Sequence, residues 1–270
     1  MKKYLVGTAL GHSLLGLSHF KSLKSLRTQN PERAAMVANA VLADRLVTRL
    51  CPSGGTFIDV GAHIGSIFST VHRLDSSVRI VAVEADPSKA ENLAARFDYI
   101  TLHACAVGDS EGQITFYIDP DATGYNSLVK REDGTQIEIS VEIRKLDDLL
   151  KDETPDVIKI DIEGAELGAL RGGAQVIAVH RPTIMFESTE TGTNALGYSP
   201  DLLWNWLHDM GYGVFTPDRL AHDAPPLDLT SFLDAHAYPM RTLNYFAVHD
   251  SKRTDIRDRA RGILGIKVGA

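Results

Sequence analysis

The sequence has little cysteine, and this shortage excludes some kinds of site. Only Cys51 and Cys105 occur among 270 residues, and neither belongs to a Cys-x-x-Cys pair, so we expect no thiolate zinc site. Cys105 lies in an apolar run, which is typical of a small core residue. Two cysteines without a pairing signal suit a reducing compartment, so we expect a cytoplasmic protein.

Runs of basic residues and long apolar runs are also missing. The net charge is −7 and the basic residues are scattered, so we expect no nucleic-acid partner, because such proteins neutralise phosphates with a basic face. No window reaches the roughly 18 apolar residues that span a bilayer, so we expect no stable membrane insertion. Lys2 and Lys3 precede a mildly apolar stretch, but His12 and Lys21 weaken a signal-peptide interpretation.

The composition is that of a packed globular protein, with 44% hydrophobic and 23% charged residues. Residues 1–51 are expected to form an N-terminal helical cap, because Asn30-Pro31-Glu32 is a helix start and apolar residues then recur at helical spacing. Pro52-Ser53-Gly54-Gly55 ends this segment. We expect the main domain over 52–250 and a basic helical tail over 251–270, and helices at both termini leave a homodimer open.

Strands and helices alternate from residue 56 onward, which predicts a doubly wound, mostly parallel seven-stranded sheet. A pair of extended segments breaks this rhythm and predicts a β insertion after the third strand. Residues 218–240, with Pro225-Pro226, are expected to form a loop. The expected strands are Thr56–Val60, Arg79–Ala85, Ile100–Val107, Gln113–Asp119, Ile137–Ile143, Asp156–Ile162, Thr183–Ser188, Val214–Thr216 and Leu243–His249. The expected helices are Ile64–Leu74, Pro87–Phe97, Leu146–Leu150, Ala165–Arg171 and Pro200–Met210.

The segment DVGAHIG, Asp59 to Gly65, joins the first strand to a helix at the edge where such sheets bind nucleotides. Glu84 ends the second strand, where a carboxylate can accept both ribose hydroxyls of an adenosine. A dinucleotide site would need G-x-G-x-x-G, but His63 and Ser66 replace the second and third glycines. S-adenosylmethionine carries no phosphate, so it fits this turn better than NAD; Asp59 suits its cationic end and turn amides suit its carboxylate.

The segment DVIKIDIEGAE places further acids at the same edge. Asp161 and Glu163 end the fourth core strand, and they share one side if the strand continues that far. Lys159 is expected to pair with a nearby acid, because an unpaired buried lysine is costly. Glu187 ends the next strand. Asp161 and Glu187 could hold a divalent metal such as Mg²⁺, or a carboxylate or His63 could act as general base, and the sequence leaves these alternatives open.

Several motifs together resemble the FkbM-type family of S-adenosylmethionine methyltransferases. They cover residues 56–190 in order: DVGAHIG, VEADP, AVGDSEG, Asn126-Ser127-Leu128, KLDDLL, and IKIDIEGAE followed by LRGGAQ. The family usually has asparagine where this chain has His63.

The resemblance implies a Rossmann-like class I methyltransferase fold. It also implies O-methylation of a small molecule or a carbohydrate, with S-adenosylmethionine as cofactor. On this basis Asp59, Gly61 and Gly65 would hold the methionine part, and Glu84 the ribose. Ala106 and Val107 would line the adenine, and Asp161 and Glu163 would face the transferred methyl group. The alternatives are an NAD(P)-dependent oxidoreductase and a non-catalytic binding module.

Overall fold

The computed structural model describes residues 6, 8, 30–119, 128, 136–189 and 197–266. Most of residues 1–29 in the expected N-terminal cap, and the candidate substrate-side residues Asn126 and Ser127, lie outside these ranges. Within them, no helix is long and apolar enough to cross a membrane.

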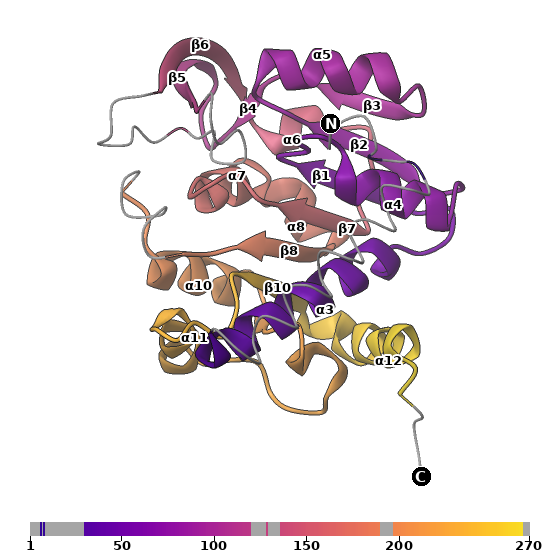
Figure 1. Ribbon diagram of the computed structural model, residues 1–270, viewed down its shortest axis with the longest axis vertical. Helices are drawn as coiled ribbons and strands as arrows, with labels where there is room; N and C mark the ends of the chain where they lie inside the picture. Colours follow the sequence, from indigo (N-terminus) through magenta and orange to yellow (C-terminus); the bar gives the residue numbers. More distant parts are fainter. Residues whose placement is uncertain are drawn as a thin grey trace.

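A seven-stranded sheet forms the centre of the molecule, in the order β3-β2-β1-β7-β8-β10-β9 (Figure 1). Neighbouring strands are parallel except that β10 runs antiparallel to both β8 and β9. This confirms the predicted doubly wound, mostly parallel α/β fold. The strands are β1 (Thr56–Val60), β2 (Arg79–Val83), β3 (Ile100–His103), β7 (Val157–Ile160), β8 (Thr183–Glu187), β9 (Tyr212–Phe215) and β10 (Asn244–His249).

Helices cover both faces of this sheet, and successive strand residues serve opposite faces. In β1, Phe57 packs with one helix layer and Ile58 with the other, and both are fully buried. Each such side chain contributes about 1.5–3 kcal/mol by burial. The Phe57 layer contains α3 (Ala34–Leu50), α4 (Ser66–Leu74), α5 (Pro87–Arg96) and α12 (Arg253–Leu264). The Ile58 layer contains α6 (Leu146–Leu149), α7 (Glu166–Gly172), α8 (Ala174–His180), α10 (Pro200–Asp209) and α11 (Leu229–His236).

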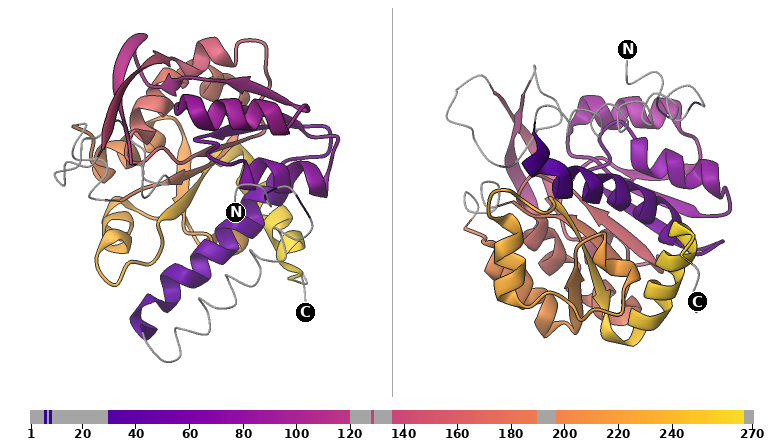
Figure 2. Two further views of the ribbon diagram at one scale, coloured as in Figure 1. Left: turned by 45° about the horizontal axis from the view of Figure 1, so that its top comes forward. Right: turned by 60° about the horizontal axis from the view of Figure 1, so that its bottom comes forward.

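Both terminal helical segments pack on the Phe57 face. Figure 2 shows α3 running across this face with α12 beside it. Leu46 of α3 and Ala260 of α12 are both fully buried in this layer. The short helical turns η1 (Pro31–Arg33), η4 (Arg219–Ala221) and η5 (Asp250–Lys252) complete the connections of this region. The division into cap, main domain and tail stays a prediction.

The β insertion follows the third strand as expected, but the third strand itself is shorter. The predicted strand Ile100–Val107 ends at His103, and Ala106–Val107 instead forms β4 of a second sheet. That sheet has the order β4-β6-β5, with β5 (Gly112–Ile118) and β6 (Ile137–Arg144) forming an antiparallel pair. The sequence from Ile100 to Val107 contains no proline or glycine, so it does not reveal where the chain changes sheets.

Two helices differ from the sequence-based expectation. Residues 229–236 form α11, whose N-cap Asp228 accepts a hydrogen bond from the Ser231 amide, although a loop is expected over 218–240. The Gly172-Gly173 pair ends α7, but α8 begins directly afterwards at Ala174. Prolines and glycines in these segments therefore mark breaks between helices and not the absence of helices.

Candidate functional site

The acids identified from the sequence meet at one edge of the sheet. The strands β1, β2, β7 and β8 are parallel neighbours, so the residues at their carboxyl ends lie together. Asp59 lies near the end of β1, Glu84 follows β2, Asp161 follows β7 and Glu187 ends β8. The chain leaves β1 toward β2 on one side and β7 lies on the other, which is the switch point where open α/β sheets bind ligands.

The turn after β1 is built by glycines and by its contact with β7. Gly61 and Gly65 have φ of 76° and 83°, in the left-handed region that glycine adopts without strain. A Cβ at Gly61 would overlap the backbone oxygen of Asp161, so this glycine also permits close approach of the two strand ends. The amides of Gly61 and Ala62 both donate to Val83 O, at 2.9 and 3.0 Å. The turn is therefore held between β2 and β7.

The carboxylate of Glu84 accepts hydrogen bonds from backbone amides in and near this turn. Its Oε2 accepts the His63 amide at 2.7 Å, and its Oε1 accepts the Asp86 amide at 2.9 Å. Burial raises the pKa of Glu84, while Lys89 and the two amide bonds counteract the shift. Because a carboxylate has about four lone-pair sites, each oxygen can still accept a ligand hydroxyl. The amides of Gly61, Ala62, His63 and Gly65 all have protein acceptors, so a methionine carboxylate would need other donors.

His63 has an unusual environment in this turn. Its φ is 52°, and its buried Nε2 finds no hydrogen-bond partner among the described residues. Burial lowers the pKa of His63 to about 4, and Lys89 and Lys159 contribute to the shift. The imidazole is therefore neutral at pH 7 and a weak general base. An orphaned buried nitrogen at the end of a strand is better suited to bind a ligand.

Lys159 pairs with acids on both sides, as the sequence predicts. Its Nζ lies 3.1 Å from Asp59 Oδ1 and 3.5 Å from Asp161 Oδ2. Burial alone would lower the pKa of Lys159, but Asp59 and Asp161 outweigh that effect and raise it. Neither carboxylate oxygen of Asp59 accepts a hydrogen bond of good geometry from the described part of the chain, so this ion pair is what compensates its buried charge.

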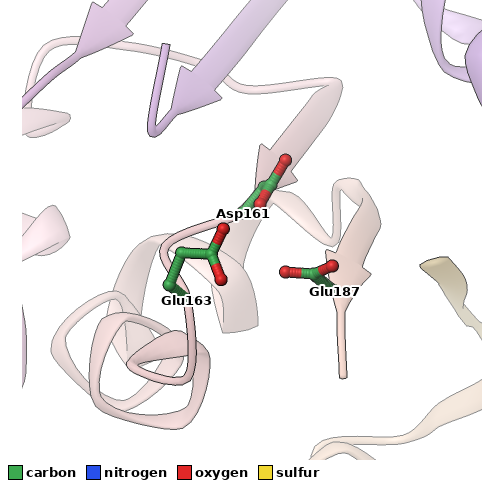
Figure 3. A group of neighbouring side chains, drawn as sticks. All are labelled: Asp161, Glu163 and Glu187. Atoms are coloured by element: carbon green, nitrogen blue, oxygen red, sulfur yellow. The ribbon is translucent and has the colours of Figure 1, made fainter. Parts of the chain in front are cut away.

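Three carboxylates meet where β7 and β8 end. One oxygen each from Asp161, Glu163 and Glu187 lies within 4.8 Å of the others. Figure 3 shows the carboxylates of Glu163 and Glu187 turned toward each other, with Asp161 beside them. Strand alternation, the expected cause, does not produce this arrangement, because β7 ends at Ile160 and Glu163 has a φ of 56°. A turn after the strand brings Glu163 back to Asp161.

Glu166 shapes that turn. Its Oε1 accepts the amides of Ile162 and Gly164, at 3.1 and 3.2 Å, and so fixes the chain on either side of Glu163. Burial raises the pKa of Glu166 to about 7, against the opposing effect of these bonds. From the first position of α7, this acid therefore binds the preceding turn as well as lying at the positive end of the helix dipole.

The carboxyl group of Glu187 keeps its proton to a pH far above the usual range for a glutamate. Burial raises its pKa to about 9, and the charges of Asp161, Glu163 and Glu166 add to the shift. A raised pKa in the folded state means that its stabilising contribution is present at low pH and is lost as the pH rises toward 9. Glu187→Gln should therefore remove this alkaline loss of stability.

We expect the Tm of Glu187→Gln to exceed that of the wild type by a margin that grows between about pH 4.5 and about pH 9, the ordinary and the raised pKa, and levels off above this range. A margin of at least about 2–4 °C, the effect of 1 kcal/mol in a domain of 150–250 residues, would be clear by calorimetry. Glu111→Gln, which removes an exposed acid, is the matched control and should show no such trend. A margin independent of pH would contradict the assignment.

Two predicted residues remain to be placed, and two other residues near this edge of the sheet are not among the sequence predictions. Ala106 and Val107 are buried in β4, next to β6 rather than in the main sheet. Lys89, on the first turn of α5, is only 12% exposed and pairs with Asp86 at 3.7 Å; burial lowers its pKa, and the charges of Glu84, Asp86 and Glu163 oppose that shift. Asn244 lies directly opposite Glu187 in the antiparallel pair of β10 and β8. No local motif reveals Asn244, because only the pairing of distant strands brings it here.

Comparisons with known proteins indicate the family of this chain. The sequence profile of the family described as "Methyltransferase FkbM domain" matches residues 59–214, from Asp59 into β9. Methyltransferase sdnD of Sordaria araneosa is 26% identical over 158 residues, covering 45% of this chain and 61% of that protein. Methyltransferase 1 of Beauveria bassiana (strain ARSEF 2860) is 22% identical over 148 residues, covering 45% and 59%. The chain thus matches about three fifths of the length of these curated relatives.

Among solved structures, methyltransferase FkbM from Methylobacillus flagellatus KT is 21% identical, with a TM-score of 0.49; the match covers 77% of this chain and 48% of that one. A putative caffeoyl-CoA O-methyltransferase from Staphylococcus aureus is 8% identical, with a TM-score of 0.42, and the match covers 88% of this chain and 98% of that one.

Proposed function

Since this chain belongs to the FkbM family of methyltransferases, we propose that it transfers a methyl group from S-adenosylmethionine to a hydroxyl oxygen of a sugar, glycan or other small metabolite. The observation that carries the proposal is the convergence of Glu84 with Asp161, Glu163 and Glu187 at one edge of the sheet. One acid would hold the adenosine and the others would face the acceptor.

The residues of the turn fit S-adenosylmethionine better than a dinucleotide. Glu84 offers free lone pairs at the end of β2, where a ribose would lie. His63 places a side chain where a dinucleotide site needs a glycine, so the backbone is closed to a pyrophosphate. The orphaned His63 Nε2 is a group that a polar ligand would satisfy, whereas the buried carboxylate of Asp59 already pairs with Lys159.

The chemistry asks mainly for alignment and for removal of one proton. The cofactor supplies a methyl group on a sulfonium, which is a good leaving group. The protein must hold the acceptor oxygen in line with the methyl carbon and sulfur. Asp161 or Glu163, rather than Glu187 with its raised pKa, would accept the hydroxyl proton as the new C–O bond forms and the C–S pair returns to sulfur.

A divalent cation is the alternative way to activate the hydroxyl. The three carboxylates offer the oxygen ligands that Mg²⁺ prefers, and a cation there would lower the pKa of the acceptor hydroxyl. Asp161, Glu163 and Glu187 would be its protein ligands. Methyl transfer that survives exhaustive treatment with EDTA supports the carboxylate as base, whereas loss that Mg²⁺ restores supports the cation.

A binding screen tests the cofactor assignment first. S-adenosylhomocysteine should raise the Tm, and NAD and NADP should not, because only a ligand of the folded state shifts the midpoint. An equal response to NAD would favour the oxidoreductase alternative. Tight binding of S-adenosylhomocysteine without methyl transfer to any of a broad panel of sugars, glycans and phenols would favour a non-catalytic module.

Asp161→Asn then separates binding from chemistry. We expect it to lower kcat by about 10²–10⁴-fold, the usual contribution of a positioned acid or base, with S-adenosylhomocysteine affinity little changed. Single-turnover transfer of a labelled methyl group, together with calorimetric titration, measures both quantities. A variant that retains full turnover would show that Asp161 does not take part in proton removal.

A further inference from the structure

Lys159 contacts more than its acidic partners. Its side chain is 6% exposed, in the middle of the sheet, between β1 and β8. Besides Asp59 and Asp161, its Nζ contacts the carbonyl oxygens of Gly61 at 2.8 Å and Val60 at 3.4 Å. The shortest of these four contacts is with Gly61, in the cofactor turn, and not with either carboxylate.

The contact with Gly61 completes the support of one peptide group. Gly61 O accepts from Lys159 on the β7 side, while the amide of Ala62, in the same peptide, donates to Val83 O at 3.0 Å on the β2 side. The plane of this peptide is therefore held from both directions. Its orientation decides how the chain enters the His63 region and α4.

The contact of Lys159 with Asp161 connects it to the carboxylates that would face the acceptor. The Asp161 side chain is 41% exposed, and it belongs to the carboxylate cluster with Glu163 and Glu187. The Asp161 amide also donates to Val60 O at 3.2 Å, so backbone and side chain both join the end of β7 to the end of β1. A single ammonium group thus touches the turn that would bind the cofactor and an acid that would face the acceptor.

We infer that Lys159 is a positioning residue that couples the cofactor turn to Asp161, and this inference rests on the proposed function. The ammonium donates an N–H to Gly61 O, and its charge pairs with both Asp59 and Asp161. The competing explanation is that Lys159 serves only to neutralise the buried Asp59. That role requires only the contact with Asp59. It predicts that replacement of Lys159 changes neither amide exchange nor ligand affinity once residue 59 is neutral.

The test therefore starts from Asp59→Asn, in which no buried carboxylate charge remains at that position. Asp59→Asn with Lys159→Met is compared with Asp59→Asn alone, so that the double variant leaves no unpaired buried ion of this pair. Hydrogen–deuterium exchange without ligand follows the bonded amides of residues 61–65 and 161–164. Calorimetric titration with S-adenosylhomocysteine gives the affinity. If the double variant does not fold, Lys159→Gln, which keeps two amide donors, replaces Lys159→Met.

We expect the backbone amides of both segments to exchange about tenfold faster in the double variant than in Asp59→Asn, because both segments lose their contact with the Lys159 ammonium. We also expect its S-adenosylhomocysteine affinity to fall by about tenfold. Lys159→Gln in the same background should lose less than Lys159→Met, since its amide can still donate to Gly61 O. A merely structural role would instead change the Tm without a selective change in these two segments.

Three results would overturn the inference: equal exchange in the double and single variants, faster exchange in only one segment, or faster exchange in both with unchanged affinity. If the wild type binds neither S-adenosylmethionine nor S-adenosylhomocysteine, the proposed function is wrong. The exchange data, which need no ligand, still decide in that case whether Lys159 joins the two segments.

Discussion

Gly61→Ala should destabilise the protein by about 2–5 kcal/mol and abolish binding of S-adenosylhomocysteine. Two costs add at this position. An L residue in the left-handed region costs about 1–2 kcal/mol, and Gly61 has a φ of 76°. Overpacking costs about 1–3 kcal/mol more, because the new Cβ would overlap Asp161 O and meet Ile162. Relief of the overlap has to separate β1 from β7, which moves the turn.

Gly54→Ala is the matched control for this experiment. Gly54 has nearly the same φ, 72°, but a Cβ there would meet no atom within 4 Å. Gly54→Ala should therefore lower the free energy of unfolding only by the backbone strain, about 1–2 kcal/mol, and leave ligand affinity unchanged. Urea unfolding of both variants gives the two free energies. Equal losses would mean that the contact between the strand ends contributes nothing to the need for glycine at Gly61.

Glu84→Gln should weaken binding of S-adenosylhomocysteine by about 100-fold. Hydrogen bonds to a charged group contribute about 1.5–3 kcal/mol and those to a neutral group about 0.5–1.5 kcal/mol, so loss of the charge toward two ribose hydroxyls costs about 2–3 kcal/mol, or roughly 100-fold in affinity. Glutamine has nearly the size of glutamate and retains one oxygen to accept the amide of His63 or Asp86. The fold should therefore survive, and calorimetric titration measures the affinity directly.

Two further variants make the Glu84 result interpretable. Glu91→Gln removes an exposed acid from the adjacent helix α5 and should leave the affinity unchanged. Glu84→Ala should bind even more weakly than Glu84→Gln, because it also leaves the buried amides of His63 and Asp86 without an acceptor. If Glu84→Gln binds as tightly as the wild type, Glu84 does not hold the ribose.

Much of the fold is predictable from local pattern. The strand at Thr56–Val60 and the helix that follows Asp86-Pro87 are located almost to the residue, because apolar runs and an N-cap are local signals. Asp86 does accept the amides of Ser88 and Lys89, as an N-cap should. The prediction of the third strand is wrong for the opposite reason: nothing local shows that the chain leaves one sheet at His103 and joins another at Ala106.

The candidate site is predictable only in part. Parallel strands bring their carboxyl ends to one edge, so the order of strands and acids along the chain is enough to place Glu84, Asp161 and Glu187 together. The position of Glu163 is not predictable in this way, since it depends on a left-handed residue and on Glu166 binding the turn behind it. The position of Asn244 opposite Glu187 is not predictable either, because it depends on the antiparallel pairing of β10 with β8.

The order of strands and helices, the glycine turn and the residue types at the strand ends can be read from local sequence, because they follow from periodicity and backbone preference. The interactions of those residues depend on how the chain folds. The tertiary structure placed Lys159 between Gly61 and Asp161 and gave Gly61 its close contact with β7. It also raised the pKa of Glu187 to about 9. Distances, burial and the sum of neighbouring charges depend on segments far apart in the chain, so no local pattern can encode them.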